Sequence, residues 1–364
     1  MTRHRRRDYR GRAAAGIGAL QRWYSPEAGL WESTGWWNAA NALTAVIRYI
    51  RDTGDQTYLP IIETTFTAAQ ARHAGFINTF YDDNGWWALA WVDAYDLTGD
   101  GRYLAAAQAI FAHNRGGWDG TCGGGLWWNQ ERRYKNAITN ELFLTLAALL
   151  YQRAPGNRDY LDWALREWEW LHGSGLIGPA GLVNDGLTRA CANNGGTTWT
   201  YNQGVILGGL AALHEITGDQ GYLRQGQIVA DAALGALTDA RGILAEPCEP
   251  SGCDGDQTQF KGIFVRYLRE FSRRAGQPAY RAFILANADS VWDNARNPAG
   301  QFGLRWAGPF DTADASRQAS AVEVLTAAAA LTAGTSRWRR PGPAAFVRNK
   351  IKGLSRTDAW LRRS

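Results

Sequence analysis

The residues best suited to chemistry in this chain are two adjacent carboxylates, Asp82 and Asp83, placed just ahead of Trp86, Trp87 and Trp91. Hydrolysis of a glycosidic bond needs one carboxylic acid and one carboxylate, and the C–H faces of sugar rings stack on indoles. An aspartate at this place can equally be an N-cap that accepts hydrogen bonds from the first turn of a helix. The rest of the chain must therefore decide between carbohydrate chemistry and a helix cap.

The adjacency of Asp82 and Asp83 leads to a prediction about their pKa values. Because two neighbouring carboxylates resist ionising together, the pKa of one should be raised while the other stays charged. Retaining glycosidases hold their two carboxyl groups about 5 to 5.5 Å apart, and inverting ones about 6.5 to 9.5 Å apart. Consecutive Cα atoms lie about 3.8 Å apart and their side chains can reach either separation, so sequence alone does not decide the stereochemistry.

Other motifs that could carry chemistry are incomplete. Residues 173–178 match the dinucleotide pattern G-x-G-x-x-G, but they follow a predicted helix instead of a strand. Asp254 and Asp256 resemble the start of a calcium loop, but Val265 stands where the bidentate glutamate is needed. The five histidines form no H-E-x-x-H motif, and no G-x-S-x-G is present. We therefore predict carboxylate chemistry with no metal and no cofactor.

Charge is divided unevenly along the 364 residues. Residues 1–12 and 337–364 together hold fifteen basic and two acidic residues, which leaves 24 basic against 32 acidic residues between them. We predict basic tails at 1–9 and 336–364 around a single domain of residues 10–335, whose acidic balance argues against nucleic acid as a partner. The C-terminal tail intersperses apolar residues with cations, a composition that suits peripheral contact with an anionic membrane.

The sequence contains no recognisable targeting or membrane-spanning segment. The charged N-terminus is not followed by an apolar segment of about 7 to 15 residues, so it is not a signal peptide as given, and no apolar run reaches about 18 residues. These features predict a cytoplasmic or membrane-peripheral protein, or an exported one if a leader was removed. A composition rich in Ala, Arg and Gly with a single Met indicates a high-GC bacterium.

Four cysteines allow disulfides without requiring them. Cys248 and Cys253 enclose a tight turn that can bring their sulfurs together, whereas Cys122 and Cys191 lie in separate glycine-rich loops. Closer pairs or nearby histidines, which zinc would need, are absent from the sequence. We predict a local disulfide between Cys248 and Cys253 in an oxidising compartment.

A repeated corner organises the chain. Thr-Gly-Asp occurs at 53–55, 98–100 and 217–219, each time before Tyr-Leu, and weaker copies lie at 154–161 and 275–280. Each corner has a residue that ends one helix and a polar or proline residue that starts the next. Five corners spaced 45 to 62 residues apart predict an array of helical hairpins.

The segments on either side of the corners form six predicted helix pairs. Small, apolar helices begin near residues 37, 85, 137, 202, 261 and 318, and more polar helices occupy 10–22, 58–72, 102–114, 158–171, 221–237 and 279–295. Because an amphipathic helix turns its apolar face to the core, the polar set should form an outer layer. These features predict an all-α (α/α)6 toroid of six inner and six outer helices, with the inner N-termini on one face.

Six ordered motifs fall near these inner N-termini. They are YDDNGWWALAW at 81–91, CGGGLWW at 122–128, YKNAITNELF at 134–143, GLVNDGL at 181–187, WTYNQG at 199–204 and DQTQFKGIF at 256–264. Through them, most of residues 10–335 resembles glycoside hydrolase family 76, the endo-α-1,6-mannanases of bacteria and fungi. The resemblance implies an (α/α)6 fold and retaining hydrolysis inside α-1,6-linked mannose chains. It also implies that Asp82 is the nucleophile and Asp83 the general acid/base.

Further residues of the matching motifs are predicted to hold the sugar by stacking or by hydrogen bonds. They are Trp86, Trp87, Trp128, Asn140, Asp185, Tyr201, Gln203, Asp256 and Phe260. For any one tryptophan, packing between helices explains the residue equally well, and Asp185 and Tyr201 are the strongest candidates for polar contacts. We expect a monomer that acts on an α-1,6-linked mannan or a mannosylated glycolipid.

The same residues can be compared with the requirements of two other enzyme classes and of one binding function. A transglycosylase that passes the glycosyl intermediate to another sugar needs the same aspartate pair, and only its acceptor differs. A glycan-binding protein without catalysis needs only the tryptophans, and the presence of both carboxylates argues against it. An (α/α)6 epimerase or isomerase would need histidines at the mouth of the toroid, the face that carries the N-termini of the inner helices. The histidines here lie instead in predicted helices or in the N-terminal tail.

Overall fold

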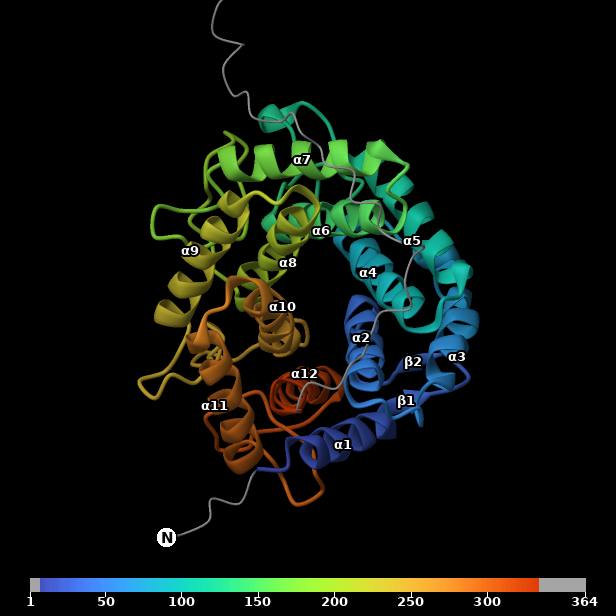
Figure 1. The fold of residues 1–364 in the computed structure, drawn as a ribbon, viewed down its shortest axis with the longest axis vertical. Helices are drawn as coiled ribbons and strands as arrows, with labels where there is room; N and C mark the ends of the chain where they lie inside the picture. The colour runs from blue at the N-terminus through green and yellow to red at the C-terminus, as the bar shows by residue number, and fades with distance from the viewer. Residues whose placement is uncertain (1–6, 334–364) are drawn as a thin grey trace, which may run out of the picture.

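A computed structural model describes residues 7–333, and it confirms the predicted toroid (Figure 1). Twelve α-helices within these residues alternate between an inner and an outer ring. The inner helices are α2 (Trp36–Thr53), α4 (Tyr81–Thr98), α6 (Ala137–Arg153), α8 (Thr200–Thr217), α10 (Phe260–Ala275) and α12 (Ala315–Thr332). The outer helices are α1 (Tyr9–Leu20), α3 (Pro60–Ala68), α5 (Gly101–Asn114), α7 (Arg158–Gly173), α9 (Gln220–Ala236) and α11 (Pro278–Asn294).

The inner ring is closed and closely packed. Each inner helix packs against the next, and α12 packs against α2, so the ring has no open edge (Figure 1). A Cβ added to Gly204 of α8 would lie 2.6 Å from the Cα of Phe264, and one added to Gly262 of α10 would lie 2.5 Å from the Cα of Ser320. Such distances leave no room for a side chain, so glycine is what allows α8, α10 and α12 to approach this closely.

The three Thr-Gly-Asp corners end their inner helices as the sequence predicts, whereas α6 ends before Ala154 without a left-handed glycine and α3 begins at Pro60 without a side-chain cap. Gly54, Gly99 and Gly218 end α2, α4 and α8 in the left-handed conformation, with φ of 74°, 75° and 77°. Asp100 and Asp219 then cap the following outer helices, accepting hydrogen bonds from the N–H groups two residues ahead. Each corner therefore turns the chain outward from the inner ring with local interactions only.

Some boundaries differ from the prediction. Helix α4 begins at Tyr81, four residues earlier than expected, so the two aspartates lie within its first turn and Phe80 occupies the N-cap position. The interpretation of the aspartates as N-caps is therefore wrong. Helix α1 begins at Tyr9, inside the predicted N-terminal tail, because Asp8 caps it and the Tyr9 ring is buried.

Loops and short elements complete the described chain. An antiparallel hairpin of β1 (Tyr24–Ser25) and β2 (Leu30–Trp31) links α1 to α2. Short 3-10 helices are η1 (Gln21–Trp23), η2 (Ala69–Ala71), η3 (Ala74–Phe76), η4 (Arg115–Gly117), η5 (Thr121–Gly123) and η6 (Gln257–Gln259). The long connections 115–136 and 174–199 are joined by a bridge between Asn136 and Gly186. Long connections on one face of a helical scaffold are typical places for a functional site.

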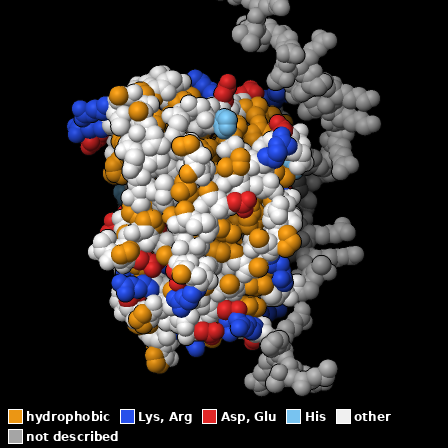
Figure 2. Space-filling model, turned by 90° about the vertical axis from the view of Figure 1, so that its left-hand side faces the viewer, with side chains coloured by type: hydrophobic (Ala, Val, Ile, Leu, Met, Phe, Trp, Pro, Cys, Tyr) orange, Lys and Arg blue, Asp and Glu red, His pale blue; other side chains and the backbone are white. Residues whose placement is uncertain are grey.

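The outer surface is of mixed character. Over the side that carries α9 and α11, charged side chains of both signs are interspersed with apolar and uncharged atoms (Figure 2). Within residues 7–333, no helix is long and apolar enough to cross a membrane. The predicted C-terminal basic tail at 336–364, and residues 1–6 of the N-terminal one, lie outside the described residues.

Candidate active site

The first turn of α4 presents the two aspartates to different partners. Asp82 Oδ2 accepts a hydrogen bond of 2.9 Å from Nε1 of Trp128, while its Oδ1 is buried and has no hydrogen-bond partner among the described residues. Asp83 Oδ2 accepts a hydrogen bond of 2.7 Å from Nδ2 of Asn78. One oxygen of Asp82 is thus held by an indole, while the other is buried and carries no hydrogen bond from the described residues.

Asn78 is itself fixed by the start of α4. Its Oδ1 accepts a hydrogen bond of 2.8 Å from the Phe80 N–H, and its own N–H donates to Oδ1 of Asn84 at 2.8 Å. Asn84 is fully buried and also donates to Asn114 of the outer helix α5. Asp83 is therefore held by a chain of amides that leads from the mouth of the ring to its outer layer.

Burial raises the pKa of both aspartates. For Asp82 the loss of water raises the pKa well above its usual range, the charge of Asp83 raises it further, and the hydrogen bond from Trp128 opposes both effects. Burial likewise raises the pKa of Asp83 to about 6, where the hydrogen bond from Asn78 lowers it and the charge of Asp256 raises it. The sequence predicted one raised pKa. Both rise because the mouth desolvates both groups, so the pair retains a proton to higher pH than free carboxyls would.

Aromatic rings from four inner helices form a wall beside the pair. The Trp37 ring stacks on Trp86 with 5.6 Å between centroids, and Trp86 stacks on Tyr201 at 6.5 Å. Tyr201 lies flat against Phe260 at 3.8 Å, and Nε1 of Trp37 donates to Oδ1 of Asp256 at 2.9 Å. This wall joins α2, α4, α8 and α10, and thereby brings four of the predicted binding residues to one place.

The loops around Trp128 form a second wall. The Tyr134 hydroxyl donates to Oδ2 of Asp185 and accepts a hydrogen bond of 3.0 Å from Asn194. Burial raises the pKa of the Asp185 carboxyl, and the Tyr134 hydroxyl lowers it. The Trp128 ring packs edge-on against Tyr134 at 6.3 Å and is 36% exposed. Trp128 and Asp185 therefore lie in the same polar wall through their contacts with Tyr134, and part of the Trp128 ring is exposed where a sugar could pack.

A disulfide holds this wall together. Cys122 is bonded to Cys191, 69 residues further along the chain, a pairing that the sequence did not predict. Beneath it, the buried Lys135 Nζ donates to Oδ1 of Asp119 at 3.0 Å and to the carbonyl oxygens of Gly124 and Gly125 at 2.6 and 2.8 Å. A single ammonium thus collects a glycine-rich turn that has no regular secondary structure of its own.

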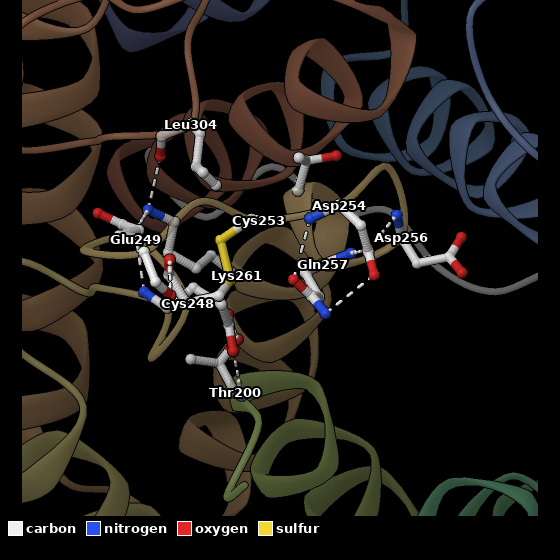
Figure 3. The surroundings of a disulfide bond; sticks show 12 residues. Thr200, Cys248, Glu249, Cys253, Asp254, Asp256, Gln257, Lys261 and Leu304 are labelled. Atoms are coloured by element: carbon white, nitrogen blue, oxygen red, sulfur yellow. Dashed lines mark hydrogen bonds and ion pairs between the residues drawn. A yellow bond between two sulfur atoms is a disulfide. The ribbon is translucent and has the colours of Figure 1, made fainter.

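The second disulfide, Cys248–Cys253, forms as predicted and lies at the start of α10 (Figure 3). Next to it, the buried Lys261 Nζ donates to Oε1 of Glu249 and to the Leu304 carbonyl oxygen (Figure 3). Asp254 accepts hydrogen bonds from the N–H groups of Asp256 and Gln257 at 3.0 and 3.1 Å. These contacts orient the segment from which Asp256 reaches Trp37.

Three predicted binding residues have no exposed surface, and direct contact with a sugar is wrong for them in this structure. Trp87, Asn140 and Gln203 are each 0% exposed. Trp87 packs between Trp36 and Trp91. Asn140 bonds the main chain of Leu126, and Gln203 that of Val183, so both amides support loops. Trp86 and Phe260 are nearly buried, at 3% and 5%.

Some residues near the pair were not predicted as site residues. Asn78 and Tyr134 each hold one of the predicted carboxylates, and Trp37 both stacks on Trp86 and binds Asp256. Asn78 has a usable sequence signal, since an Asn two residues ahead of a helix N-cap commonly turns the chain through its side chain. Tyr134 has none, because its partner Asp185 comes from a separate loop.

Within residues 7–333, no group of three or more His, Cys, Asp or Glu side chains is placed to hold a metal ion. The prediction of chemistry without a metal or cofactor stays a prediction.

Comparison with known proteins gives a consistent result. A model of Glycosyl hydrolase family 76 matches residues 14–338. The mannan endo-1,6-alpha-mannosidase of Saccharomyces cerevisiae is 32% identical over an alignment of 261 residues that covers 64% of this chain and 57% of that protein. The enzyme of the same description from Candida albicans is 30% identical over 259 residues with the same shares. The chain thus spans just over half the length of these curated relatives.

Solved structures extend the similarity over the whole toroid. The α-1,6-mannanase of a Salegentibacter species aligns with a TM-score of 0.81 and 28% identity, covering 89% of this chain and 100% of that one. An inactive variant of the same mannanase, with two adjacent aspartates replaced by alanine, is known in complex with α-1,6-mannotetrose and aligns with a TM-score of 0.80 at 27% identity and the same coverage.

Proposed function

This chain belongs to glycosyl hydrolase family 76, and on that premise we propose that it cleaves internal α-1,6-mannosidic bonds of a mannan with retention of configuration. The observation that carries the proposal is the Asp82-Asp83 pair, two desolvated carboxylates with raised pKa beside an aromatic wall. The mannanase relatives support the substrate class, and the variant that binds α-1,6-mannotetrose is inactive after loss of two adjacent aspartates.

We assign Asp82 as the nucleophile and Asp83 as the general acid/base. An ionised Asp82 Oδ1 attacks the anomeric carbon while Asp83 gives its proton to the leaving glycosidic oxygen, and a covalent mannosyl ester forms. Asp83 then takes a proton from water, whose oxygen attacks the same carbon and releases Asp82. Two displacements give retention.

The surroundings of each aspartate fit these roles. The Trp128 N–H stabilises negative charge on Oδ2 of Asp82 and leaves Oδ1 without a competing donor. A pKa of about 6 lets Asp83 be protonated before bond cleavage and ionised after it, as an acid that later acts as a base requires. Once Asp83 holds the proton, the repulsion that opposes ionisation of Asp82 is removed.

The mannan is proposed to contact the exposed groups of the two walls. Trp128 offers a ring face, while Asp185, Tyr201 and Asp256 offer polar atoms to the hydroxyl groups of mannose. Trp86, Phe260 and the buried residues behind them act by fixing the wall. We further propose a mannosylated glycolipid as a second substrate, peripheral contact with a membrane, a monomeric state and a bacterial source.

The alternatives are separated by the acceptor and by turnover. A transglycosylase would share the first displacement but pass the mannosyl group to a sugar hydroxyl instead of water. A glycan-binding protein would bind without cleavage, and the desolvated aspartate pair is costly to keep for binding alone.

Product analysis on unbranched α-1,6-mannan tests the proposal. We expect a series of internal fragments whose newly formed reducing ends appear first in the α configuration. Longer products with no net gain of reducing ends would indicate transglycosylation. Intact mannan after prolonged incubation, with saturable binding, would refute catalysis.

A further inference from the structure

A cavity of about 270 Å³ lies outside the catalytic mouth, between the connection 115–136 and the connection 174–199. Its lining includes Arg132 and Arg133 from the first connection and Thr188 and Arg189 from the second, with the Trp127 ring beside them. No part of the proposed hydrolysis uses these residues.

The cavity is on the reverse side of the wall that carries Trp128. Adjacent tryptophans point in opposite directions: Nε1 of Trp128 binds Asp82, whereas Nε1 of Trp127 binds Oδ2 of Asp119 at 2.7 Å. Tyr134 and Lys135 diverge in the same way, the first toward Asp185 and the second toward Asp119. One layer of main chain therefore separates the cavity from the groups proposed to bind the sugar.

The three arginines that line the cavity have few acidic partners for their positive charges. Arg132 lies 3.5 Å from Asp119 and donates to the Gly116 carbonyl oxygen at 3.1 Å, and Arg133 has only Glu131, at 3.6 Å. Arg189 forms no ion pair or hydrogen bond within residues 7–333. Several N–H donors on three arginines from two connections are thus left for a ligand, in a chain whose body is acidic overall.

The scaffold under these arginines is rigid. The Cys122–Cys191 disulfide joins the two connections, and the main chains also pair at Asn136 and Gly186. Lys135 is already occupied by Asp119 and three carbonyl oxygens of the glycine-rich turn, so it fixes the floor of the cavity instead of adding a free charge. The arginines consequently stand on fixed main chain, which lowers the entropic cost of gathering them around an anion.

We propose that this cavity binds a phosphate group carried by the glycan substrate, a proposal that rests on the function proposed above. A planar carboxylate is satisfied by one guanidinium, whereas the oxygens of a phosphate can accept from three arginines and from the Thr188 hydroxyl at once. The cavity is large enough for one such group and adjoins the wall of Trp128, so it suits a phosphate-bearing mannan that extends past the catalytic mouth.

Titration calorimetry with inorganic phosphate, mannose 6-phosphate and mannose tests the site directly. We expect both phosphates to bind the wild type, with an affinity that falls as salt rises, and mannose 6-phosphate to bind more tightly because its sugar lies toward the wall. The double variant Arg133→Ala/Arg189→Ala should weaken phosphate binding roughly tenfold or more. Arg224→Ala, which removes an exposed arginine of α9, is the matched control and should change nothing.

Binding that is absent in the wild type, or equal in the double variant, would overturn the proposal. Phosphate binding that is lost in the double variant without any preference for mannose 6-phosphate would overturn the assignment to the glycan and leave a site for free phosphate.

A kinetic comparison separates this proposal from the proposed hydrolysis. On phosphorylated α-1,6-mannan the double variant should show a raised KM with unchanged kcat, and on neutral α-1,6-mannan it should match the wild type. If the double variant had the KM of the wild type on phosphorylated mannan as well as on neutral mannan, the proposed phosphate site would be contradicted. If neither mannan is cleaved by the wild type, hydrolysis fails while the calorimetric titration still decides the phosphate site.

Discussion

The two ends of the inner ring use the same residue type in opposite ways. At the N-terminal ends of the inner helices, Asp82 and Asp83 are desolvated and form no ion pair within residues 7–333, and burial raises their pKa. In the C-terminal halves, carboxylates are paired with arginines. Arg48 bonds Asp93 at 2.9 Å and Glu270 at 2.6 Å, and the arginines lower the pKa of Glu270 to about 2.

These ion pairs continue around much of the ring, and we call the C-terminal halves of the inner helices that carry them the paired end. Its ion pairs between different inner helices are Arg266 with Glu323, Arg269 with Asp52, Arg153 with Asp96 and Arg274 with Glu215. The mouth is held mainly by aromatic stacking, amide networks and two disulfides, and the ion pairs Lys135–Asp119 and Lys261–Glu249 lie in its loops. Carboxylates in the C-terminal halves therefore tie neighbouring inner helices together, whereas burial of Asp82 and Asp83 at the other end gives them the raised pKa that proton exchange requires.

The largest effect should come from removing either mouth carboxylate. Asp82→Asn and Asp83→Asn should each reduce kcat on α-1,6-mannan about a thousandfold or more, because each acts chiefly in the transition state. Thermal unfolding should show an intact fold. Asp93→Asn, at the paired end, is the control and should lower stability while sparing kcat.

A substrate whose leaving group needs no proton sharpens this test. It should partly restore turnover to Asp83→Asn and leave Asp82→Asn inactive. Either variant keeping more than roughly a tenth of wild-type activity on unactivated mannan would refute its assigned role.

Next in size is the loss of Arg48. Arg48→Met should destabilise the fold by about 3 to 5 kcal/mol in urea unfolding, because Asp93 and Glu270 lose a buried partner. Arg102→Met breaks an exposed pair with Glu63 and should cost about 1 kcal/mol or less. Similar losses in the two variants would mean that the paired end contributes little to stability.

The disulfides should matter in proportion to the loops they close. Replacing Cys122 and Cys191 by serine should cost about 4 kcal/mol, and replacing Cys248 and Cys253 about 2 kcal/mol, because longer loops lose more entropy when crosslinked. Hydrogen exchange should show the loss at the mouth and leave amides of the paired end protected. Loosening at both ends alike would indicate that the ends are not independent.

The smallest effect that we expect is a change in the pH dependence of the free energy of unfolding when one carboxylate from each end is replaced. The folded pKa of Asp83, about 6, exceeds its unfolded value, so its ionisation opposes folding fully above pH 6 and not at all below about pH 4. Asp83→Asn should therefore stabilise the protein at pH 7 by about 1 to 2 kcal/mol.

Glu270 should show the opposite sign. Its folded pKa of about 2 lies below the unfolded value, so it adds stability above about pH 4.5 that is lost as pH falls toward 2. Glu270→Gln should destabilise by about 2 kcal/mol at pH 7 and have little effect near pH 2. Denaturant unfolding at several pH values measures both. Matching signs at pH 7 would contradict the contrast between the ends.

The sequence predicted the ring because its signals are local. The Thr-Gly-Asp corners combine a left-handed glycine with a cap, and both act within a few residues of Gly54, Gly99 and Gly218. The aspartate pair was equally accessible, since it is one dipeptide in a recognisable motif.

The orientation of individual motif residues was not predictable in the same way. Inner helices are apolar on nearly all sides, and each residue turns the side chain by about 100°, so neighbours such as Trp86 and Trp87 face the wall and the core respectively. The Cys122–Cys191 pairing depends on two connections meeting in space, which no local signal records.

Carbon-13 NMR titration of labelled aspartate and glutamate carboxyl groups, assigned with Asp83→Asn and Glu270→Gln, tests the contrast most directly. We predict that Asp83 titrates near pH 6, that Asp82 titrates above its usual range, and that the pKa of Asp82 falls once Asp83 is replaced by asparagine. We also expect Glu270 to stay ionised down to about pH 2. Midpoints near pH 4 for Asp82, Asp83 and Glu270 alike would contradict it.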